Sequence, residues 1–274
     1  MWMVALFAAT AASPENTARL ALMHGVPEKW EVERNFAVFL DQLESASSQD
    51  ATVFITPECW LDGYAAAAPD STPEKLHAIA QQQDTSAYLR RVAKEAKARG
   101  MIICFGYTSL EDGRLYNTAG LWNAEGTQIG RYHKTHLQAH DLQYAPGDGF
   151  PVWDSTVGKV GIMICADRRW PETTRALRLG GARLILNPTY GFHGDMNEAI
   201  MRTRAFENQC YIAFAHPECS LVTGPKGAIV TKWTGDSPGV TVCDIDLSLA
   251  MDDNHLKDRR PEIYGILTRP SASK

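Results

Sequence analysis

Residues 161–172 read GIMICADRRWPE, a run in which an apolar segment ends at a cysteine and is followed by the start of a helix. The apolar residues before Cys165 are typical of a buried strand, and Pro171 is typical of the first turn of a helix. A buried strand that passes at once into a helix indicates an α/β protein.

The same alternation extends over the rest of the chain. Hydrophobic periodicity predicts further helices at 30–47, 85–99 and 195–208. The predicted strands lie at 19–24, 51–55, 101–107, 115–122, 127–132, 157–164, 183–187, 210–215, 220–222, 228–233 and 240–245. Some of these strands are joined through helices and others through hairpin turns, so we expect mixed sheets arranged in layers. The absence of a repeat or a linker in the sequence favours one domain.

The composition limits the classes of function. The 274 residues are 45% hydrophobic and 22% charged, which is enough apolar material for a large core, and the net charge is −5. A mildly acidic chain without a concentrated basic face argues against nucleic acid or an anionic membrane as partner. No apolar run approaches the roughly 20 residues that span a bilayer. The six scattered cysteines predict neither a disulfide scaffold nor a structural zinc site, and favour reduced thiols in the cytoplasm.

The N-terminal sequence MWMVALFAATAA is apolar. It resembles the hydrophobic region of a secretory signal peptide but lacks the positively charged start of one. We therefore expect an N-terminal extension over 1–18, packed on the domain or on a partner, and a single domain over 19–270. A cytoplasmic protein is favoured over a secreted one.

Cys165 is the first candidate for chemistry. A strand-to-helix turn presents a side chain outward among free helix N–H groups, which favour a thiolate. Arg168 and Arg169 add positive charge nearby. The alternative is a buried cysteine at a strand end, acting as a small hydrophobic residue. The arginines and the turn favour a nucleophile.

Two more polar residues follow apolar strands. Glu58 comes after the strand at 51–55, and Lys134 comes after the strand at 127–132. The first could be a solvated cap and the second a loop lysine in water. However, sites gather at the carboxyl ends of strands in α/β sheets. There a carboxylate could move a proton between a thiol and a leaving amine, and a fixed cation could stabilise an oxyanion.

These segments together resemble the nitrilase superfamily of carbon–nitrogen hydrolases. The matching stretches are Thr-Pro-Glu58, Tyr-His-Lys134-Thr-His-Leu and Ile-Cys165-Ala-Asp, in the order that the superfamily shows. The resemblance implies a four-layer α-β-β-α sandwich, often dimerised. It also implies a thioester acyl-enzyme on Cys165, with Glu58 as general base and then acid, and Lys134 and the backbone N–H of Ala166 around the oxyanion. It implies no metal and no cofactor.

The chain departs from the superfamily at one position. Members often carry a second glutamate a few residues after the lysine that helps to place the substrate. Asp141 is the nearest candidate here, with a side chain one methylene shorter, and His140 takes that place if the alignment shifts by one.

The nucleophile segment also bears on the substrate. True nitrilases usually have Cys-Trp-Glu there, whereas Cys165-Ala-Asp-Arg-Arg-Trp is similar to N-carbamoyl-D-amino-acid hydrolases, in which paired arginines bind the substrate carboxylate. The resemblance predicts an amide or ureido substrate, with nitriles disfavoured. The arginines could instead pair with Asp167 or Glu172. The predicted substrate-binding residues are Asp141, Arg168, Arg169, Trp170, Asn187, Tyr190 and His193, and packing is the alternative for the aromatic ones.

Three other classes of function compete with this interpretation. His133, His136 and His140 are close in sequence and could bind a metal, although neither strand nor helix spacing puts all three on one face. A scaffold protein that has lost its chemistry would keep the same fold. A glutaminase subunit that feeds ammonia to a synthetase is also compatible, although no synthetase domain is attached. The intact set of Glu58, Lys134 and Cys165 favours an enzyme.

Overall fold

Alternate residues of the first strand face two different hydrophobic layers. In β1 (Thr17–His24), Ala18, Leu20 and Leu22 belong to one buried cluster, while Ala21 and Met23 belong to another. Side chains of a strand point to opposite faces in turn, so a strand that is apolar at every position is covered on both sides. This strand therefore lies in an inner layer of the protein.

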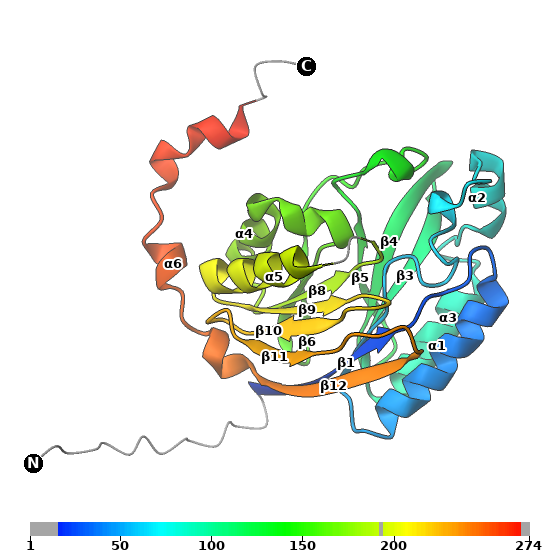
Figure 1. Ribbon diagram of the computed structural model, residues 1–274, viewed down its shortest axis with the longest axis horizontal. Helices are drawn as coiled ribbons and strands as arrows, with labels where there is room; N and C mark the ends of the chain where they lie inside the picture. Colours follow the sequence, from blue (N-terminus) through cyan, green and yellow to red (C-terminus); the bar gives the residue numbers. More distant parts are fainter. Residues whose placement is uncertain (1–15, 192–193, 270–274) are drawn as a thin grey trace, which may run out of the picture.

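The computed structural model describes residues 16–191 and 194–269, and Figure 1 shows their arrangement. The described strands form two six-stranded sheets. In order across the first sheet they are β12 (Gly239–Asp246), β1, β2 (Val53–Ile55), β3 (Ile102–Glu111), β4 (Arg114–Trp122) and β5 (Gln128–His133). In order across the second sheet they are β11 (Ile229–Lys232), β10 (Leu221–Thr223), β9 (Tyr211–Ala215), β8 (Leu184–Pro188), β7 (Gly158–Ile162) and β6 (Val152–Ser155).

Helices cover the outer face of each sheet (Figure 1). The first sheet packs against α1 (Val32–Ser47) and α3 (Ala87–Arg99), and the second packs against α4 (Pro171–Leu179) and α5 (Asp195–Asn208). The largest core cluster takes residues from both sheets and lies between them. These four layers confirm the α-β-β-α sandwich that the resemblance implies.

Parallel pairing at the centre of each sheet places strand ends together. Strands β1, β2 and β3 are parallel neighbours in the first sheet, and β7, β8 and β9 are parallel neighbours in the second. Antiparallel strands complete both sheets, which confirms that they are mixed. Because the carboxyl ends of parallel strands meet at one edge, the segments that follow β2 and β7 are well placed to form a site.

Most predicted elements are present, with shifted ends. Helix α3 ends at Gly100, whose φ of +61° gives the left-handed cap that glycine favours. Strand β1 begins at Thr17, so part of the expected extension belongs to the first sheet; residues 1–15 lie outside the described residues. The sequence analysis did not predict α2 (Pro73–Ile79), β6 or the short α6 (Asn254–Lys257). No helix in the described ranges is both long and apolar enough to cross a membrane.

Candidate active site

Cys165 lies just beyond the end of β7, at the start of a short 3-10 helix over Cys165–Arg169. Its φ of +45° is a left-handed value that costs energy in a residue with a Cβ, and such strain is found mainly at functional sites. The side chain is 8% exposed. The next backbone N–H, that of Ala166, lies in the first turn of this helix, where amides have no acceptor within the helix. The structure thus confirms a sharp turn at the cysteine.

Glu58 lies in the loop after β2 and is buried. Its Oε1 accepts hydrogen bonds from Asn117 Nδ2 at 2.8 Å and from Lys134 Nζ at 2.8 Å. Its Oε2 is buried and has no hydrogen-bond partner among the described residues. A buried carboxylate oxygen without a partner is costly, so this atom is the natural acceptor for a proton from outside the cluster.

A glycine allows the Glu58 loop to pack against the neighbouring strand. A Cβ on Gly106 in β3 would lie 2.6 Å from the carbonyl oxygen of Pro57 and 2.8 Å from the backbone nitrogen of Cys59. The Gly106 N–H donates to Thr56 Oγ1 at 2.9 Å. The backbone around Glu58 is therefore held directly by the backbone of β3, and any larger residue at position 106 would displace it.

Lys134 follows β5 and is also buried, although lysine is rarely found inside proteins. Its Nζ donates to Glu58 Oε1 at 2.8 Å, to Asp141 Oδ2 at 2.6 Å and to Tyr64 OH at 3.2 Å. Burial lowers the pKa of this ammonium group, but the charges of Glu58 and Asp141 raise it by more, so that the pKa lies above its ordinary value. Lys134 is thus a permanent cation and not a proton acceptor.

The charges of the same cluster shift the pKa of the Cys165 thiol. Burial raises its pKa and the Glu58 carboxylate raises it further, whereas Lys134 and Arg168 lower it, and the net pKa lies above the ordinary value. The structure therefore brings Glu58 and Lys134 from the first sheet to Cys165 of the second. At neutral pH the sulfur carries its proton, and a base has to remove it before the sulfur can attack.

Asp141 and Tyr64 form the far side of the cluster. The Tyr64 hydroxyl donates to Asp141 Oδ1 at 2.5 Å, while Asp141 Oδ2 accepts from Lys134 and from the Gln138 backbone at 3.0 Å. Both carboxylate oxygens are therefore engaged, and the side chain is completely buried. This arrangement favours a role in holding the lysine over the expected contact with substrate. Sequence reasoning missed Tyr64, which follows Glu58 by six residues and carries a positive φ of 56°.

The two arginines after the cysteine differ in burial and in their described partners. Arg168 is completely buried: its Nε and Nη2 donate to Asn197 Oδ1 at 3.1 and 2.7 Å, and its Nη1 lies 3.5 Å from Cys165 Sγ. Arg169 is exposed, and its Nη1 donates to Gln138 Oε1 at 2.8 Å. The expected binding of a substrate carboxylate by both arginines stays a prediction, and of the two only Arg169 is exposed.

The other predicted substrate-binding residues lie at different depths. Asn187 is buried and donates from Nδ2 to the Met163 carbonyl at 2.9 Å, which ties β8 to the cysteine segment. Tyr190 is half-buried and meets the Tyr64 ring edge-on at 5.4 Å between centroids. Trp170 is 37% exposed and stacks on the His136 ring at 4.2 Å. His193 lies outside the described residues.

The three histidines considered as metal ligands have separate partners. His133 stacks on Tyr116, His136 bonds to Asp167, and His140 meets the edge of Tyr64. Within 16–191 and 194–269, no three His, Cys, Asp or Glu side chains are placed so that they could hold a metal ion together. Each of these three histidines thus has a side-chain partner of its own.

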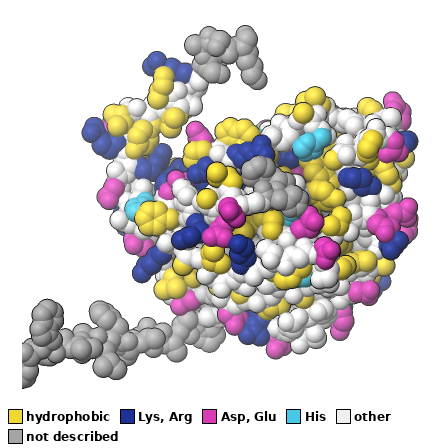
Figure 2. Space-filling view, in the orientation of Figure 1, with side chains coloured by type: hydrophobic (Ala, Val, Ile, Leu, Met, Phe, Trp, Pro, Cys, Tyr) yellow, Lys and Arg dark blue, Asp and Glu magenta, His cyan; other side chains and the backbone are white. Residues whose placement is uncertain are grey.

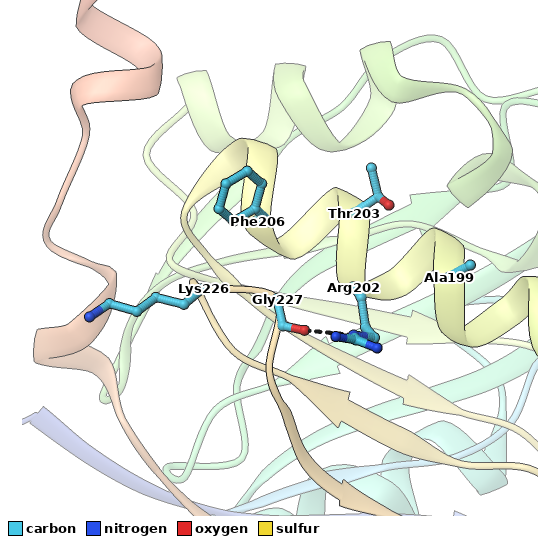
Figure 3. A pocket seen from close by; sticks show the side chains of 6 residues that line it. All are labelled: Ala199, Arg202, Thr203, Phe206, Lys226 and Gly227. Atoms are coloured by element: carbon cyan, nitrogen blue, oxygen red, sulfur yellow. Dashed lines mark hydrogen bonds between the residues drawn. The ribbon is translucent and has the colours of Figure 1, made fainter.

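A groove of about 350 Å³ runs along the outer face of α5 (Figure 3). Its described lining consists of Ala199, Arg202, Thr203, Phe206, Lys226 and Gly227. Within it, Arg202 Nε donates to the Gly227 carbonyl at 2.9 Å. The groove lies on the helix side of the second sheet and shares no residue with the cluster around Cys165, so we assign it no part in the chemistry.

The chain is similar to several known hydrolases. A relative from Pseudomonas protegens, described as a hydrolase in the pqqF 5′ region, is 33% identical over an alignment of 290 positions that covers 97% of each chain. A nitrilase of Pyrococcus abyssi is 31% identical and covers 90% of this chain and 98% of its own. Human omega-amidase NIT2 is 27% identical and covers 82% of this chain and 88% of its own.

A solved structure shows the same fold. An amidase from Nesterenkonia AN1, of the nitrilase superfamily, superposes with a TM-score of 0.77 at 25% identity, over 93% of this chain and 98% of the other. The family model for carbon–nitrogen hydrolases matches residues 19–253. Since that match spans most of the sequence and two relatives exceed 30% identity over nearly all of it, the chain belongs to the carbon–nitrogen hydrolase family.

Proposed function

We propose that this enzyme hydrolyses the carbon–nitrogen bond of a small amide or ureido substrate through a thioester on Cys165. The observation that carries the proposal is the buried contact between Lys134 and Glu58, at 2.8 Å, beside a thiol whose pKa both groups shift. One carboxylate, one ammonium and one thiol in a buried site are the three groups that acyl transfer from an amide needs.

The first step moves the thiol proton. Because burial raises the pKa of Cys165, the sulfur needs a base, and Glu58 Oε2 is the oxygen of the cluster that has no described hydrogen-bond partner. The sulfur then attacks the carbonyl carbon, and the tetrahedral intermediate expels ammonia with the proton that Glu58 received. Water, deprotonated by the same carboxylate, attacks the thioester, and the carbonyl product leaves as Cys165 regains its proton.

Lys134 can hold the oxyanion only after a change of partner. An ammonium group has three N–H donors, and here they point to Glu58, Asp141 and Tyr64. The Tyr64 contact, at 3.2 Å, is the longest and involves a neutral acceptor, so it is the weakest of the three. We propose that the oxyanion takes the place of Tyr64, assisted by the N–H of Ala166.

We propose that Arg169 selects the side chain of the substrate. Arg168 is engaged with Asn197 and the sulfur, whereas the Arg169 guanidinium reaches the surface beside Gln138. A substrate with a carboxylate would meet Arg169 and Trp170 at the rim, and Tyr190 deeper in the site. N-carbamoyl amino acids remain one such class, and amides with a distal carboxylate are another.

One assay separates these classes. Purified protein is given simple aliphatic amides, ω-amides, N-carbamoyl amino acids and nitriles, and ammonia release is followed with wild type and with Cys165→Ala. We expect release from at least one amide or ureido class with wild type and none with the variant. Failure of every amide and ureido class, or equal release by Cys165→Ala, would reject the proposal.

We also propose that the protein is a homodimer or a larger homo-oligomer. The C-terminal segment extends beside α4 and α5 away from the sheets, and Figure 2 shows hydrophobic side chains exposed along it. Ile263, Ile266 and Leu267 are 58%, 66% and 62% exposed, and Phe206 of α5 is 53% exposed. Apolar surface of this kind favours association. Sedimentation velocity of wild type and Ile266→Glu tests this, and a monomeric wild type would reject it.

We place the enzyme in the cytoplasm. All six cysteines are free, including the proposed nucleophile, and reducing compartments keep thiols in that state. Cell fractionation of the producing organism tests this proposal, and recovery of the active protein outside the cytoplasm would reject it.

A further inference from the structure

We infer that Asp167 is a positioning residue that locks the segment bearing Lys134, from the first sheet, against the turn bearing Cys165, from the second. The inference rests on the proposed function. It concerns a residue that the proposed mechanism does not use: Asp167 is completely buried, two residues after the cysteine.

Asp167 binds both segments at once. Its Oδ2 accepts the Ile164 N–H at 2.9 Å, on the cysteine side, and the Tyr132 hydroxyl at 2.7 Å, on the lysine side. Its Oδ1 accepts from Thr135 Oγ1 at 2.8 Å and from the N–H and Nδ1 of His136 at 2.9 and 2.7 Å. The carboxylate therefore holds residues on both sides of Lys134 in the sequence.

These bonds cross the interface between the sheets. Tyr132 lies in β5 of the first sheet, and Ile164 follows β7 of the second. The rest of that interface is a cluster of apolar side chains, whose packing is not directional. Hydrogen bonds to a charged group fix distance and angle, so Asp167 can set the spacing between Lys134 and Cys165 where apolar contacts alone would leave it loose.

We call Asp167 and its hydrogen bonds to Ile164, Tyr132, Thr135 and His136 the clamp. Further contacts hold the clamp in place. A carboxylate only accepts hydrogen bonds, so His136 presents a protonated Nδ1 to Asp167. The His136 ring stacks on Trp170 at 4.2 Å with the planes 8° apart. The sequence left Asp167 as a possible partner of the neighbouring arginines, but the described partners of its carboxylate lie in residues 132–136 or at Ile164.

The clamp should affect two measurable properties of the site. Lys134 lowers the pKa of the Cys165 thiol, so a Lys134 that moves away leaves this pKa higher. The proposed oxyanion contact would also lengthen, and a misplacement of about 1 Å can cost about 100-fold in rate. Substrate binding at the rim should change little.

The test uses Asp167→Asn, which replaces one carboxylate oxygen by an NH₂ group. This group donates hydrogen bonds, and so do the groups that surround it, so the bonds on that side are lost. We expect kcat for the best amide to fall about 100-fold with KM within about threefold. Alkylation of Cys165 by iodoacetamide should reach a given rate only at a higher pH than in wild type. Tyr132→Phe and Thr135→Val remove one donor each and keep the charge, so they should show smaller shifts in the same direction, even if Asp167→Asn does not fold.

Glu95→Gln is the matched control. Glu95 is a buried carboxylate on α3 that pairs with Arg91 and Arg99, far from the site. This control should lower the melting temperature without moving the alkylation profile or kcat. The inference is overturned if the Asp167, Tyr132 and Thr135 variants also change only stability. Alkylation does not depend on turnover, so failure of the proposed function, which Cys165→Ala tests, is distinguishable from failure of the clamp.

Discussion

Replacement of Lys134 by glutamine tests the charge balance of the buried cluster. Lys134 and its partners Glu58 and Asp141 have completely buried side chains, and one ammonium faces two carboxylates at 2.8 and 2.6 Å. Glutamine keeps most of the side-chain length and two N–H donors but removes the positive charge. Two carboxylates would then share a dry site without a cation.

The structure sets the expected magnitude. Removing one partner of a buried ion pair costs about 3–5 kcal/mol, and because Lys134 serves two carboxylates we expect the upper half of that range. For a chain of this length, about 4 kcal/mol corresponds to a drop in melting temperature of about 8–16 °C. Loss of the proposed oxyanion donor should also lower kcat by about 10²–10³-fold.

Thermal and urea unfolding of wild type, Lys134→Gln and Lys134→Gln/Asp141→Asn measure the effect. The double variant removes one of the two unpaired charges, so it should recover part of the lost stability without recovering activity. Lys75→Gln, which breaks the exposed pair with Asp70, should leave stability unchanged.

Two results would refute this reasoning. A loss below about 1 kcal/mol in Lys134→Gln would mean that the cluster does not depend on the buried cation. A double variant less stable than the single one would mean that Asp141 stabilises the fold through bonds other than the one to Lys134.

Further predictions concern the remaining groups. Cys165→Ala should keep the circular dichroism spectrum and lose ammonia release, and turnover at the wild-type rate would contradict the nucleophile. Glu58→Gln should lower kcat by about 10²–10⁴-fold with substrate affinity less affected, as judged by steady-state kinetics. Because the pKa of the Cys165 thiol is raised, its alkylation should keep accelerating at pH values where an exposed thiol has levelled off; a plateau near neutral pH would contradict a protonated resting state. Arg169→Lys should raise KM for amides that carry a carboxylate and leave neutral amides unchanged, and an equal rise for both would remove its role in specificity.

Much of the architecture could be predicted because its signals are local. The strand β1 is apolar at successive positions, α5 has the predicted bounds Asp195–Asn208, and Pro171 begins α4. Elements with weak local signals were missed. Strand β6 contains Trp153 and Asp154 in a four-residue edge strand, and α2 is seven residues long. Pairing with β7 and packing on the domain stabilise such short elements, and neither interaction is local in sequence.

The residues of the site, like the elements of the fold, could be predicted where their signals are local in sequence. The candidate residues Glu58, Lys134 and Cys165 could be found because each follows an apolar strand, and the structure brings them together. The paired role expected of Arg168 and Arg169 stays a prediction, and the sequence could not show that the first is buried and the second exposed, because this depends on the backbone of the turn. Tyr64 could not be assigned to the site because it does not directly follow an apolar strand, and only the fold brings its hydroxyl to Lys134 and Asp141.

The sequence by itself determined most of the strands and helices, and which reactive side chains follow them, since hydrophobic periodicity and caps act within a few residues. Only the tertiary structure decided how the two sheets face each other, that Asp141 holds the lysine, and that Asp167 spans both halves of the site. The physical reason is that these contacts join atoms far apart along the chain. Their geometry is set by the packing of the whole sandwich and by hydrogen bonds between buried polar groups, and no local pattern encodes it.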